Sequence, residues 1–352
     1  MAYTTINKST EHFNTVTYSN AGDGAKAVTG VGFQPDFTWL KARGAAYHHQ
    51  LFDAVRGATS GTLYSSNNDA VDTGYPLSSF DSDGFTTGAQ SSNAGQNSAS
   101  HVAWNWKAGT TGSGTTTGSG TGKAYSYSVN TTAGFSIIKY KGNGTAGHTI
   151  PHHLGAVPKM IITKVTSASG NNWKVYHVGS GNTKVLQLNI ADAEATSGAW
   201  NNTTPTSSVF TLGNDGATNG NDKDTIAYCF AEKAGYSKFG SYTGNNNANG
   251  TFVYTGFKPS FIMIKSSSAG GDNAYSWSMF DNKRSSYNIE RAMLKANLSD
   301  AEYTSGSNAD IDILSNGFKL RASPNETNGS NTYIYMAFGQ SLVGSNNVPC
   351  TA

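Results

Sequence analysis

The sequence predicts an all-β protein made of three related β-sandwich domains, and composition, strand pattern and an internal repeat support this. The chain of 352 residues contains 41 Gly and only 13% charged residues, well below the roughly 25% of typical globular proteins. Thr, Ser, Asn, Tyr and Phe are abundant, and these residues favour turns and half-buried sheet surfaces. Since 37% of the residues are hydrophobic, the chain can build a core, and disorder is not expected.

Strands are predicted from short aromatic and β-branched runs that lie between turn residues. TIAYCF at 225–230 and TYIYMAF at 332–338 have strand length, and Asp-Gly and Asn-Gly pairs mark turns elsewhere in the chain. Short helical pieces are expected only at 189–196 and 297–303. Units of about 100–120 residues with several short strands are typical of β-sandwiches.

An internal repeat divides the chain into three parts. The phrases GFQPDFTWLK, GAVPKMIITK and GFKPSFIMIK share a proline and a lysine. The aligned residues are Pro35, Pro158 and Pro259, and Lys41, Lys164 and Lys265. Further downstream, a Leu-x-x-Asn-like element aligns Asn67, Asn189 and Asn297, and a closing aromatic strand aligns Trp104, Tyr228 and Tyr335.

The repeat predicts β-sandwich domains at residues 1–108, 123–232 and 233–352. Residues 109–122 are rich in Gly, Thr and Ser and offer no side chain that could anchor a core, so they are predicted to be a flexible linker. No similar tract separates the second and third domains. We therefore expect these two to form a rigid pair, and the first domain to be more independent.

Charge and cysteine content exclude several classes of protein. The formal net charge is +2, from 24 basic and 22 acidic residues, without a basic run, so no nucleic-acid partner is expected. Cys229 and Cys350 lie too far apart in the sequence to indicate a disulfide framework. The N-terminus has no apolar export segment, and no apolar stretch has the length of a membrane span. A soluble protein without membrane insertion is expected.

Several phrases of the sequence resemble a repeat found in tailed bacteriophages, notably marine ones. They include GFQPDFTWLK, LFDAVRG, LYSSN, SFDSDGFTTG, HVAWNWKAG, GFSIIKYKGNG and IAYCFAEKAGYSKFGSYTGN. The resemblance covers nearly the whole chain. It implies concanavalin A-like (lectin-like) jelly-roll β-sandwich domains, and it implies a structural protein of the virion that is made in the host cytoplasm.

Two functions agree with this resemblance. The first is a tail fibre or tail-tip appendage that attaches to host-surface glycans. The second is a capsid decoration or cement protein (head fibre) with a purely architectural role. The expected partners are other virion proteins of the tail or capsid, and host-surface glycans. A homotrimer is a further expectation, because phage fibres are often trimers.

Catalysis is not expected, and neither is a cofactor or a metal site. Glycosidases need two carboxylates placed across a sugar, but no acidic pair recurs, and the G-x-S-x-G elbow of hydrolases is absent. His148, His152 and His153 are interpreted as loop histidines, because no Cys or carboxylate lies close to them in the sequence. Residues 81–84 are interpreted as a polar turn rather than a calcium loop.

The candidate ligand-binding residues are tryptophans, whose ring faces could stack on sugars, although core packing is the alternative interpretation for each. They are Trp104, Trp106, Trp173, Trp200 and Trp277. The repeated residues are assigned structural roles. Besides the prolines and lysines these are two Asp-x-x-Arg pairs, Asp53 with Arg56 and Asp281 with Arg284, which are predicted to form local ion pairs or to cap a loop. The alternative is that the arginines bind a carboxylate or a phosphate. The repeated lysines are expected to cover the core edge with their stems and to hold the ammonium group in water.

Overall fold

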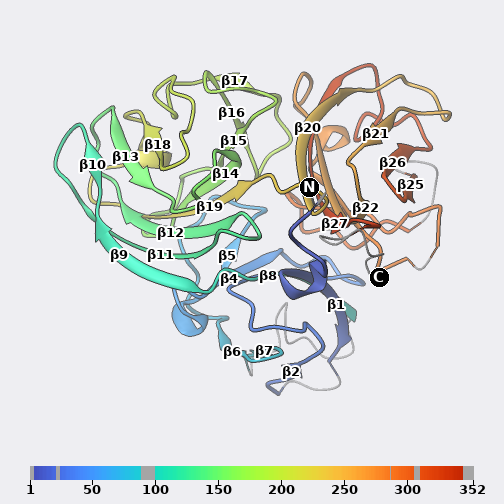
Figure 1. Ribbon diagram of the computed structural model, residues 1–352, viewed down its shortest axis with the longest axis horizontal. Helices are drawn as coiled ribbons and strands as arrows, with labels where there is room; N and C mark the ends of the chain where they lie inside the picture. Colours follow the sequence, from blue (N-terminus) through green and yellow to red (C-terminus); the bar gives the residue numbers. More distant parts are fainter. Residues whose placement is uncertain (1–3, 21–23, 89–99, 286, 305–309, 344–352) are drawn as a thin grey trace.

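The computed structural model describes residues 4–20, 24–88, 100–285, 287–304 and 310–343. Most of these residues lie in antiparallel strands and turns, so the prediction of an all-β protein is confirmed. The helical elements of the described residues are α1 (Gly216–Asn219) and the 3-10 turns η1 (Ser9–Glu11), η2 (Ala58–Ser60) and η4 (Asn273–Tyr275). The sheets form three pairs, each from a consecutive part of the chain, and the pairs surround a common centre (Figure 1).

The first sheet pair contains a five-stranded sheet and a three-stranded sheet. The larger sheet has the order β1 (Phe13–Ser19), β8 (Ser100–Trp106), β3 (Phe37–Ala42), β4 (Gln50–Asp53), β5 (Leu63–Tyr64). The smaller sheet has the order β2 (Ala27–Val28), β7 (Gly84–Thr87), β6 (Leu77–Asp81).

The third sheet pair repeats the strand order of the first. Its larger sheet has the order β20 (Ser237–Thr243), β27 (Thr332–Gln340), β22 (Lys258–Ser266), β23 (Ser278–Asp281), β24 (Leu294–Lys295). Its smaller sheet has the order β21 (Phe252–Tyr254), β26 (Gly317–Leu320), β25 (Ile311–Leu314).

The second sheet pair has the same central strands and additional ones at its edges. Its larger sheet has the order β17 (Ala195–Thr196), β16 (Lys184–Gln187), β15 (Lys174–His177), β14 (Pro158–Val165), β19 (Asp224–Ala231), β12 (Phe135–Lys141), β11 (Ala124–Asn130), β9 (Thr110–Thr115). Its smaller sheet has the order β10 (Thr117–Gly118), β13 (His148–Pro151), β18 (Val209–Leu212). Strands β12, β19, β14, β15 and β16 correspond to β1, β8, β3, β4 and β5.

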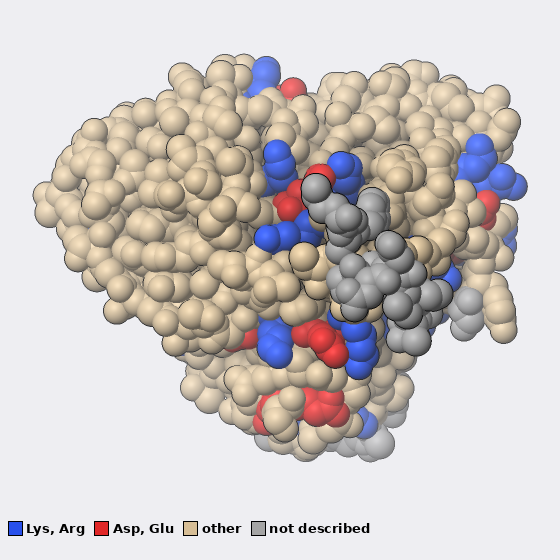
Figure 2. Space-filling model, viewed as in Figure 1, with Lys and Arg blue, Asp and Glu red and all other residues tan. Residues whose placement is uncertain are grey.

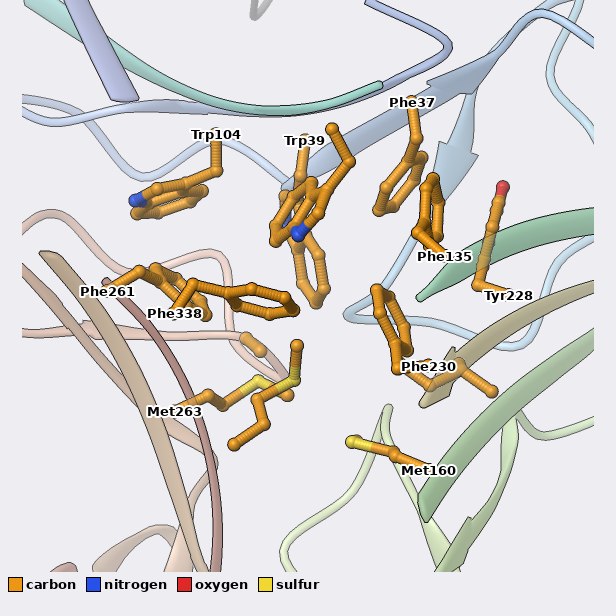
Figure 3. Close-up of a cluster of buried hydrophobic side chains, with 14 of the residues drawn as sticks. Phe37, Trp39, Trp104, Phe135, Met160, Tyr228, Phe230, Phe261, Met263 and Phe338 are labelled. Atoms are coloured by element: carbon orange, nitrogen blue, oxygen red, sulfur yellow. The ribbon is translucent and has the colours of Figure 1, made fainter. Parts of the chain in front are cut away.

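A single hydrophobic core joins the three larger sheets, and we call it the central core. Figure 3 shows part of this core, including Phe135, Phe230 and Phe338. The Trp106 ring lies near aromatic rings of all three pairs: its centroid is 4.8 Å from that of Phe13 in the first pair, 6.5 Å from that of Phe135 in the second, and 5.7 Å from that of Phe338 in the third. Each larger sheet also packs on its own smaller sheet through a separate apolar cluster. The larger sheets are therefore covered on both faces.

The continuous apolar runs of the sequence follow from this double coverage. Successive side chains of a strand point to opposite faces of its sheet. Along β19, Ile226, Tyr228 and Phe230 point into the central core, whereas Ala227 and Cys229 pack toward the smaller sheet. Because both faces are buried, the strand needs apolar residues at every position, as in other sheets that are covered on both sides.

The predicted flexible linker at 109–122 is wrong, because this segment contains β9 and β10. Strand β9 pairs with β11 and extends the larger sheet of the second pair, with Gly112 opposite Tyr127 and Gly114 opposite Tyr125. A Cβ atom at Gly112 would lie 2.6 Å from the Tyr127 hydroxyl oxygen. The glycines thus leave room for the tyrosine rings of the neighbouring strand, an arrangement known to stabilise glycine in sheets.

Two other expectations are also wrong. Residues 189–196 and 297–303 form no helix, but turns and short pairings, including β17. The first sheet pair is not independent of the others, since Phe13, Phe37 and Trp106 belong to the central core.

Cys350 lies outside the described residues, and Cys229 is a buried free thiol. None of the helices in the described part of the chain is long and apolar enough to cross a membrane.

Candidate functional site

The three pairs meet along three seams, which we name seam 1/2, seam 2/3 and seam 1/3 after the pairs that they join. Trp173, directly before β15, donates its indole proton to the Tyr64 carbonyl oxygen across seam 1/2, at 2.9 Å. Trp277, directly before β23, donates in the same way to the Gln187 carbonyl oxygen across seam 2/3, at 2.9 Å. The equivalent contacts show that the pairs are arranged around the centre in a cyclic order.

His49, directly before β4, occupies the corresponding position at seam 1/3. Burial lowers the pKa of the His49 imidazole well below its usual value, and the Lys295 backbone of the third pair acts against this shift. Trp39 donates its indole proton to His49 Nδ1 at 2.9 Å. No group of the described residues completes a hydrogen bond of normal geometry to His49 Nε2. The third seam thus has a weaker contact at this position.

The repeated lysines connect the seams in the same cyclic order. Lys164 of the second pair donates to the Asn68 carbonyl oxygen of the first pair at 3.2 Å. Lys265 of the third pair donates to the Ala191 carbonyl oxygen of the second pair at 3.1 Å. Lys41 of the first pair donates to carbonyl groups of its own pair, and carboxylates of the third pair act on its ammonium group.

These lysines do not hold their ammonium groups in water, so the expectation of exposed ends is wrong. The residues are no more than 1% exposed. Burial lowers the pKa of Lys41 and of Lys164 to about 8, and that of Lys265 to about 7. Backbone carbonyl oxygens replace water as their hydrogen-bond partners. Lys164 and Lys265 each fix a loop of the preceding pair, whereas Lys41 fixes a loop of its own pair.

Both Asp-x-x-Arg pairs form the ion pairs that the sequence predicts. Arg56 Nε lies 2.6 Å from Asp53 Oδ2, and Arg284 Nε lies 2.6 Å from Asp281 Oδ2. All four side chains are at most 5% exposed. A buried ion pair needs further hydrogen bonds to offset the loss of hydration, and the guanidinium groups donate these to backbone carbonyl groups such as that of Leu51.

Each of these buried aspartates also accepts a hydrogen bond from a neighbouring sheet pair. The Tyr228 hydroxyl group donates to Asp53 Oδ2 across seam 1/2 at 2.9 Å. The Trp104 indole donates to Asp281 Oδ2 across seam 1/3 at 2.9 Å. The two Asp-x-x-Arg ion pairs therefore also connect neighbouring sheet pairs. The sequence alone did not indicate this role.

Seam 2/3 replaces this arrangement with a neutral one. His177 occupies the position of the aspartates at the end of β15, and Met336 occupies the position of Trp104 and Tyr228. Met336 cannot donate a hydrogen bond, so an aspartate at position 177 would be buried without the donor that Asp53 and Asp281 have across their seams. The His177 ring instead bonds to the Tyr335 carbonyl oxygen at 3.1 Å, and burial lowers its pKa to about 4.

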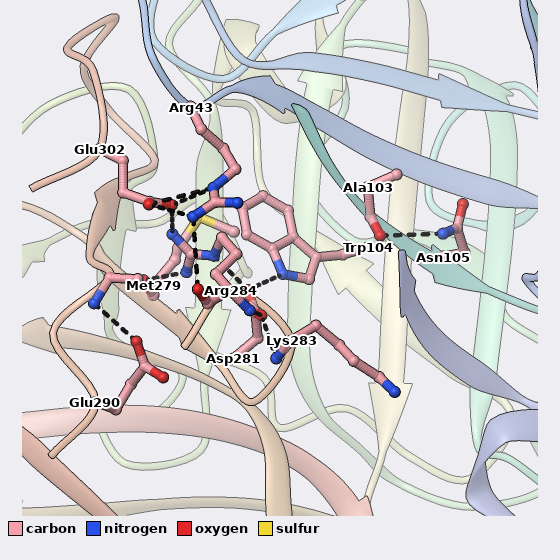
Figure 4. A network of polar contacts seen from close by, with 11 residues as sticks. Arg43, Ala103, Trp104, Asn105, Met279, Asp281, Lys283, Arg284, Glu290 and Glu302 are labelled. Carbon is pink, nitrogen blue, oxygen red and sulfur yellow. Dashed lines mark hydrogen bonds and ion pairs between the residues drawn. The ribbon is translucent and has the colours of Figure 1, made fainter. Parts of the chain in front are cut away.

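Seam 1/3 carries an additional network of ion pairs (Figure 4). Glu302 of the third pair accepts from Arg43 Nη2 at 2.7 Å and from Arg284 Nη1 at 2.9 Å. The Arg284 guanidinium carbon lies 5.4 Å from the centre of the Trp104 ring, within the range of a cation–π contact. This network links the first and last sheet pairs, which are far apart in the sequence.

The repeated prolines lie near the first residue of one central strand in each pair. Pro158 begins β14 and Pro259 follows the first residue of β22, and the pairing register shifts directly after each of them. Pro35 lies two residues before β3. Since proline cannot donate to a sheet, it is tolerated at strand ends and bulges such as these.

The tryptophans proposed as ligand residues are buried. Trp104, Trp106, Trp173, Trp200 and Trp277 are each at most 1% exposed. Four of them belong to the central core, and Trp200 belongs to the local core of the second pair. None of the five can stack on a sugar in this structure, so the assignment of ligand binding to them is wrong. Core packing, the alternative interpretation, describes their positions.

The histidine group around residue 150 does not come together as a metal site. His148 bonds to Asn219 and Thr116, and His152 faces the Thr206 carbonyl oxygen at 3.1 Å. Over the described ranges, no three metal-binding side chains cluster. The carboxylates of the 81–84 turn accept hydrogen bonds from their own pair, among them one from the Gly30 N–H to Asp83 at 2.9 Å.

Two surface features were missed at the sequence level. Phe252 and Tyr254 lie on the edge strand β21 and are 44% and 60% exposed. A hollow at seam 1/3 has a volume of about 130 Å³ and lies between η1, β1, β22 and β23. The strand alternation around Val253 could have indicated the first feature. A comparison of the three repeats for polar residues at apolar positions could have indicated the second.

The fold and its seams define a class of all-β protein in which three sheet pairs share one core. The chain belongs to the family described as a domain of unknown function (DUF7483), whose model matches residues 8–341. The match runs through all three sheet pairs as one domain. A comparison with curated proteins and one with solved structures gave no match.

Proposed function

We propose that this chain is a structural protein of a tailed-bacteriophage virion, and that it serves as a tail-fibre or tail-tip module for attachment to host-surface glycans. Within this proposal, the sheet pairs are three concanavalin A-like β-sandwiches, other virion proteins hold the chain in the particle, and the role is binding without catalysis. The sequence phrases shared with tailed-phage repeats support the virion assignment.

The observation that carries the attachment role is the fusion of three sheet pairs on one central core. The core immobilises the larger sheets and leaves the smaller sheets and turns on the outside (Figure 1). A rigid scaffold that presents loops loses little entropy when it binds. The lobe of the second pair is almost free of charged side chains on the face seen in Figure 2. Uncharged polar surfaces suit partners that are rich in hydroxyl groups.

The exposed aromatics of the third pair support a glycan rather than a purely architectural role. Phe252 and Tyr254 are two residues apart on one strand, so their rings lie on the same face. The register places Ala27 of β2 and Thr149 of β13 at the position of Phe252 in the other pairs. Among the described strands, only β21 of the third pair carries aromatic rings at these positions. The third pair thus has an exposed aromatic surface that the other two pairs lack.

The location and copy number of the protein in purified particles test the proposal. Antibody labelling should place a few copies on the tail, and the purified chain should reduce adsorption of the phage to its host. Hundreds of copies on the head would favour capsid decoration instead. Absence from particles would overturn both virion roles.

A further inference from the structure

The hollow at seam 1/3 differs in chemistry from the same place at the other seams. It lies between the first strand of the first pair and the ends of β22, β23 and β27 of the third pair. Its volume of about 130 Å³ is several times the roughly 10–15 Å³ that a single water molecule needs. Its wall is lined with hydroxyl, amide and ammonium groups, together with the ring of Phe13.

The repeats provide an internal comparison for each wall position. Thr15 lies opposite Trp104 in the pairing of β1 with β8, and the corresponding residues are Ile137 in β12 and Phe239 in β20. The seams 1/2 and 2/3 therefore have large apolar side chains where seam 1/3 has a threonine. Both apolar residues belong to the central core, and Thr15 does not.

The facing wall shows the same change. The two residues after β23 are Asn282 and Lys283, whereas those after β4 are Ala54 and Val55. Val55 packs on the central core. At seam 1/2 the two walls thus close on each other with apolar side chains. At seam 1/3 the corresponding residues of both walls, Thr15 on one side and Asn282 and Lys283 on the other, are polar, and a hollow lies between them.

Thr15 gives an independent indication of a ligand. Thr15 is 3% exposed, and no group of the described residues forms a hydrogen bond with its Oγ1 atom. A buried hydroxyl group without a partner is costly. An isoleucine, as at seam 1/2, would avoid this cost, so a bound polar group that accepts or donates here would explain the threonine.

The remaining wall indicates the charge of the ligand. Lys258 and Lys283 both line the hollow, and none of the described lining residues is acidic. Figure 4 shows the Lys283 side chain extending away from the Asp281 and Arg284 ion pair, and no hydrogen bond of its ammonium group is found among the described residues. Two free ammonium groups without a nearby carboxylate in the wall favour an anion.

We propose that the hollow at seam 1/3 binds a carboxylate-bearing sugar of the host surface. The lysines meet the carboxylate, the amide of Asn282 and the hydroxyl of Thr15 meet ring hydroxyls, and the ring of Phe13 meets an apolar sugar face. A second hollow of about 200 Å³ shares Lys258 and Asn282 and adds Tyr287, which is 86% exposed, and the carboxyl group of Glu290. It gives room for a further sugar unit, and the carboxylate of the ligand is assigned to the first hollow, whose described lining has no acidic residue. In the choice of a host ligand, the inference rests on the proposed attachment function.

Titration of the purified full chain with methyl glucuronide, followed by NMR or calorimetry, tests the inference. We expect binding that weakens as salt rises, and at least tenfold weaker binding of methyl glucoside, which lacks the carboxylate. Thr15→Ile and Lys283→Val install the residues of seam 1/2 and should each weaken binding at least tenfold. Lys184→Ala, on β16 of the second pair, is the matched control and should leave the affinity unchanged.

The folded state of the variants is checked by thermal unfolding, and Thr15→Ile should unfold at the same or a higher temperature, since isoleucine occupies this position at seam 1/2. No binding of the glucuronide, or equal binding of the glucoside, would overturn the inference. Equal binding of inorganic phosphate would indicate a general anion site and would also overturn it.

Adsorption separates this inference from the proposed function. If the chain blocks adsorption but does not bind the glucuronide, the attachment function stands and the hollow is not its site. If the chain binds the glucuronide but is absent from particles, the site stands and the virion role fails. Capsular and lipopolysaccharide oligosaccharides with acidic sugars would then identify the source of the ligand.

Discussion

Replacing Phe338 by alanine should destabilise all three sheet pairs together. Phe338 is 1% exposed, and its ring centroid lies 5.3 Å from that of Phe13 and 5.7 Å from that of Trp106 in the first pair. It lies 5.9 Å from the ring of Phe230 in the second pair. One side chain of the third pair thus contacts the other two pairs.

The expected loss can be worked out from this position. A buried Phe→Ala substitution costs about 3–5 kcal/mol, and three aromatic contacts across the seams place Phe338 in the upper half of this range. Since a folded domain has roughly 5–15 kcal/mol of stability, the loss is a large part of the total. In urea unfolding the midpoint should fall while the m-value stays unchanged.

Hydrogen exchange of peptides from β8, β19 and β27 provides the decisive measurement. If the central core makes the three pairs cooperative, Phe338→Ala should lower protection in all three strands by similar free energies. Phe252→Ala, at a position that is 44% exposed, is the control and should change stability by no more than about 0.5 kcal/mol. Lower protection in β27 alone, with β8 and β19 unchanged, would refute the shared core as a cooperative unit.

Three further predictions follow from the fold and its buried charges. Subtilisin should spare residues 109–122, because β9 and β10 lie in sheets, and a first cut there, seen by mass spectrometry, would contradict this placement. Burial lowers the pKa of His49, His152 and His177, to about 4 for the last two. Below pH 6.5 the unfolded chain therefore binds more protons than the folded chain. Urea unfolding should therefore show stability falling from pH 6.5 toward 4, by up to about 1.4 kcal/mol per pH unit for each histidine, with a smaller slope in His177→Gln. The pKa of Lys265 is lowered to about 7, so stability should rise between pH 7 and 10, and an unchanged slope in Lys265→Met would exclude this lysine as the cause.

The sequence allowed the strands and the threefold repeat to be predicted, because periodic turns and recurring phrases are local features. It also indicated that Asp53 and Asp281 pair with the arginines three residues later. It did not indicate that the same aspartates accept hydrogen bonds from Trp104 and Tyr228 of other pairs. Such contacts depend on how the sheets pack, which no short segment encodes.

The central core was missed for a related reason. A strand that is buried on both faces contains apolar residues at every position. This pattern is the same whether the second face packs within its own domain or against a core shared with other domains. The alignment of repeats was also one residue off in places, since Met336, and not Tyr335, corresponds to Trp104 in the pairing register. Likewise Ser66, and not Asn67, corresponds to Asn189 when counted from the paired strands β5 and β16. Only the register shows which face a residue occupies.

The difference between the seams follows from the way in which the chain runs through the molecule. Continuous chain links the first pair to the second and the second to the third, but seam 1/3 joins segments at opposite ends of the sequence. This closing seam carries the Glu302 network with Arg43 and Arg284, and the Ser9 N–H donates to Gln340 Oε1 at 2.6 Å. Directional polar contacts fix the pairs here without apolar packing at every position. A seam that is stabilised by polar contacts can contain a hollow. In a seam that is stabilised by apolar packing, the same hollow would remove the packing contacts that join the two sheet pairs.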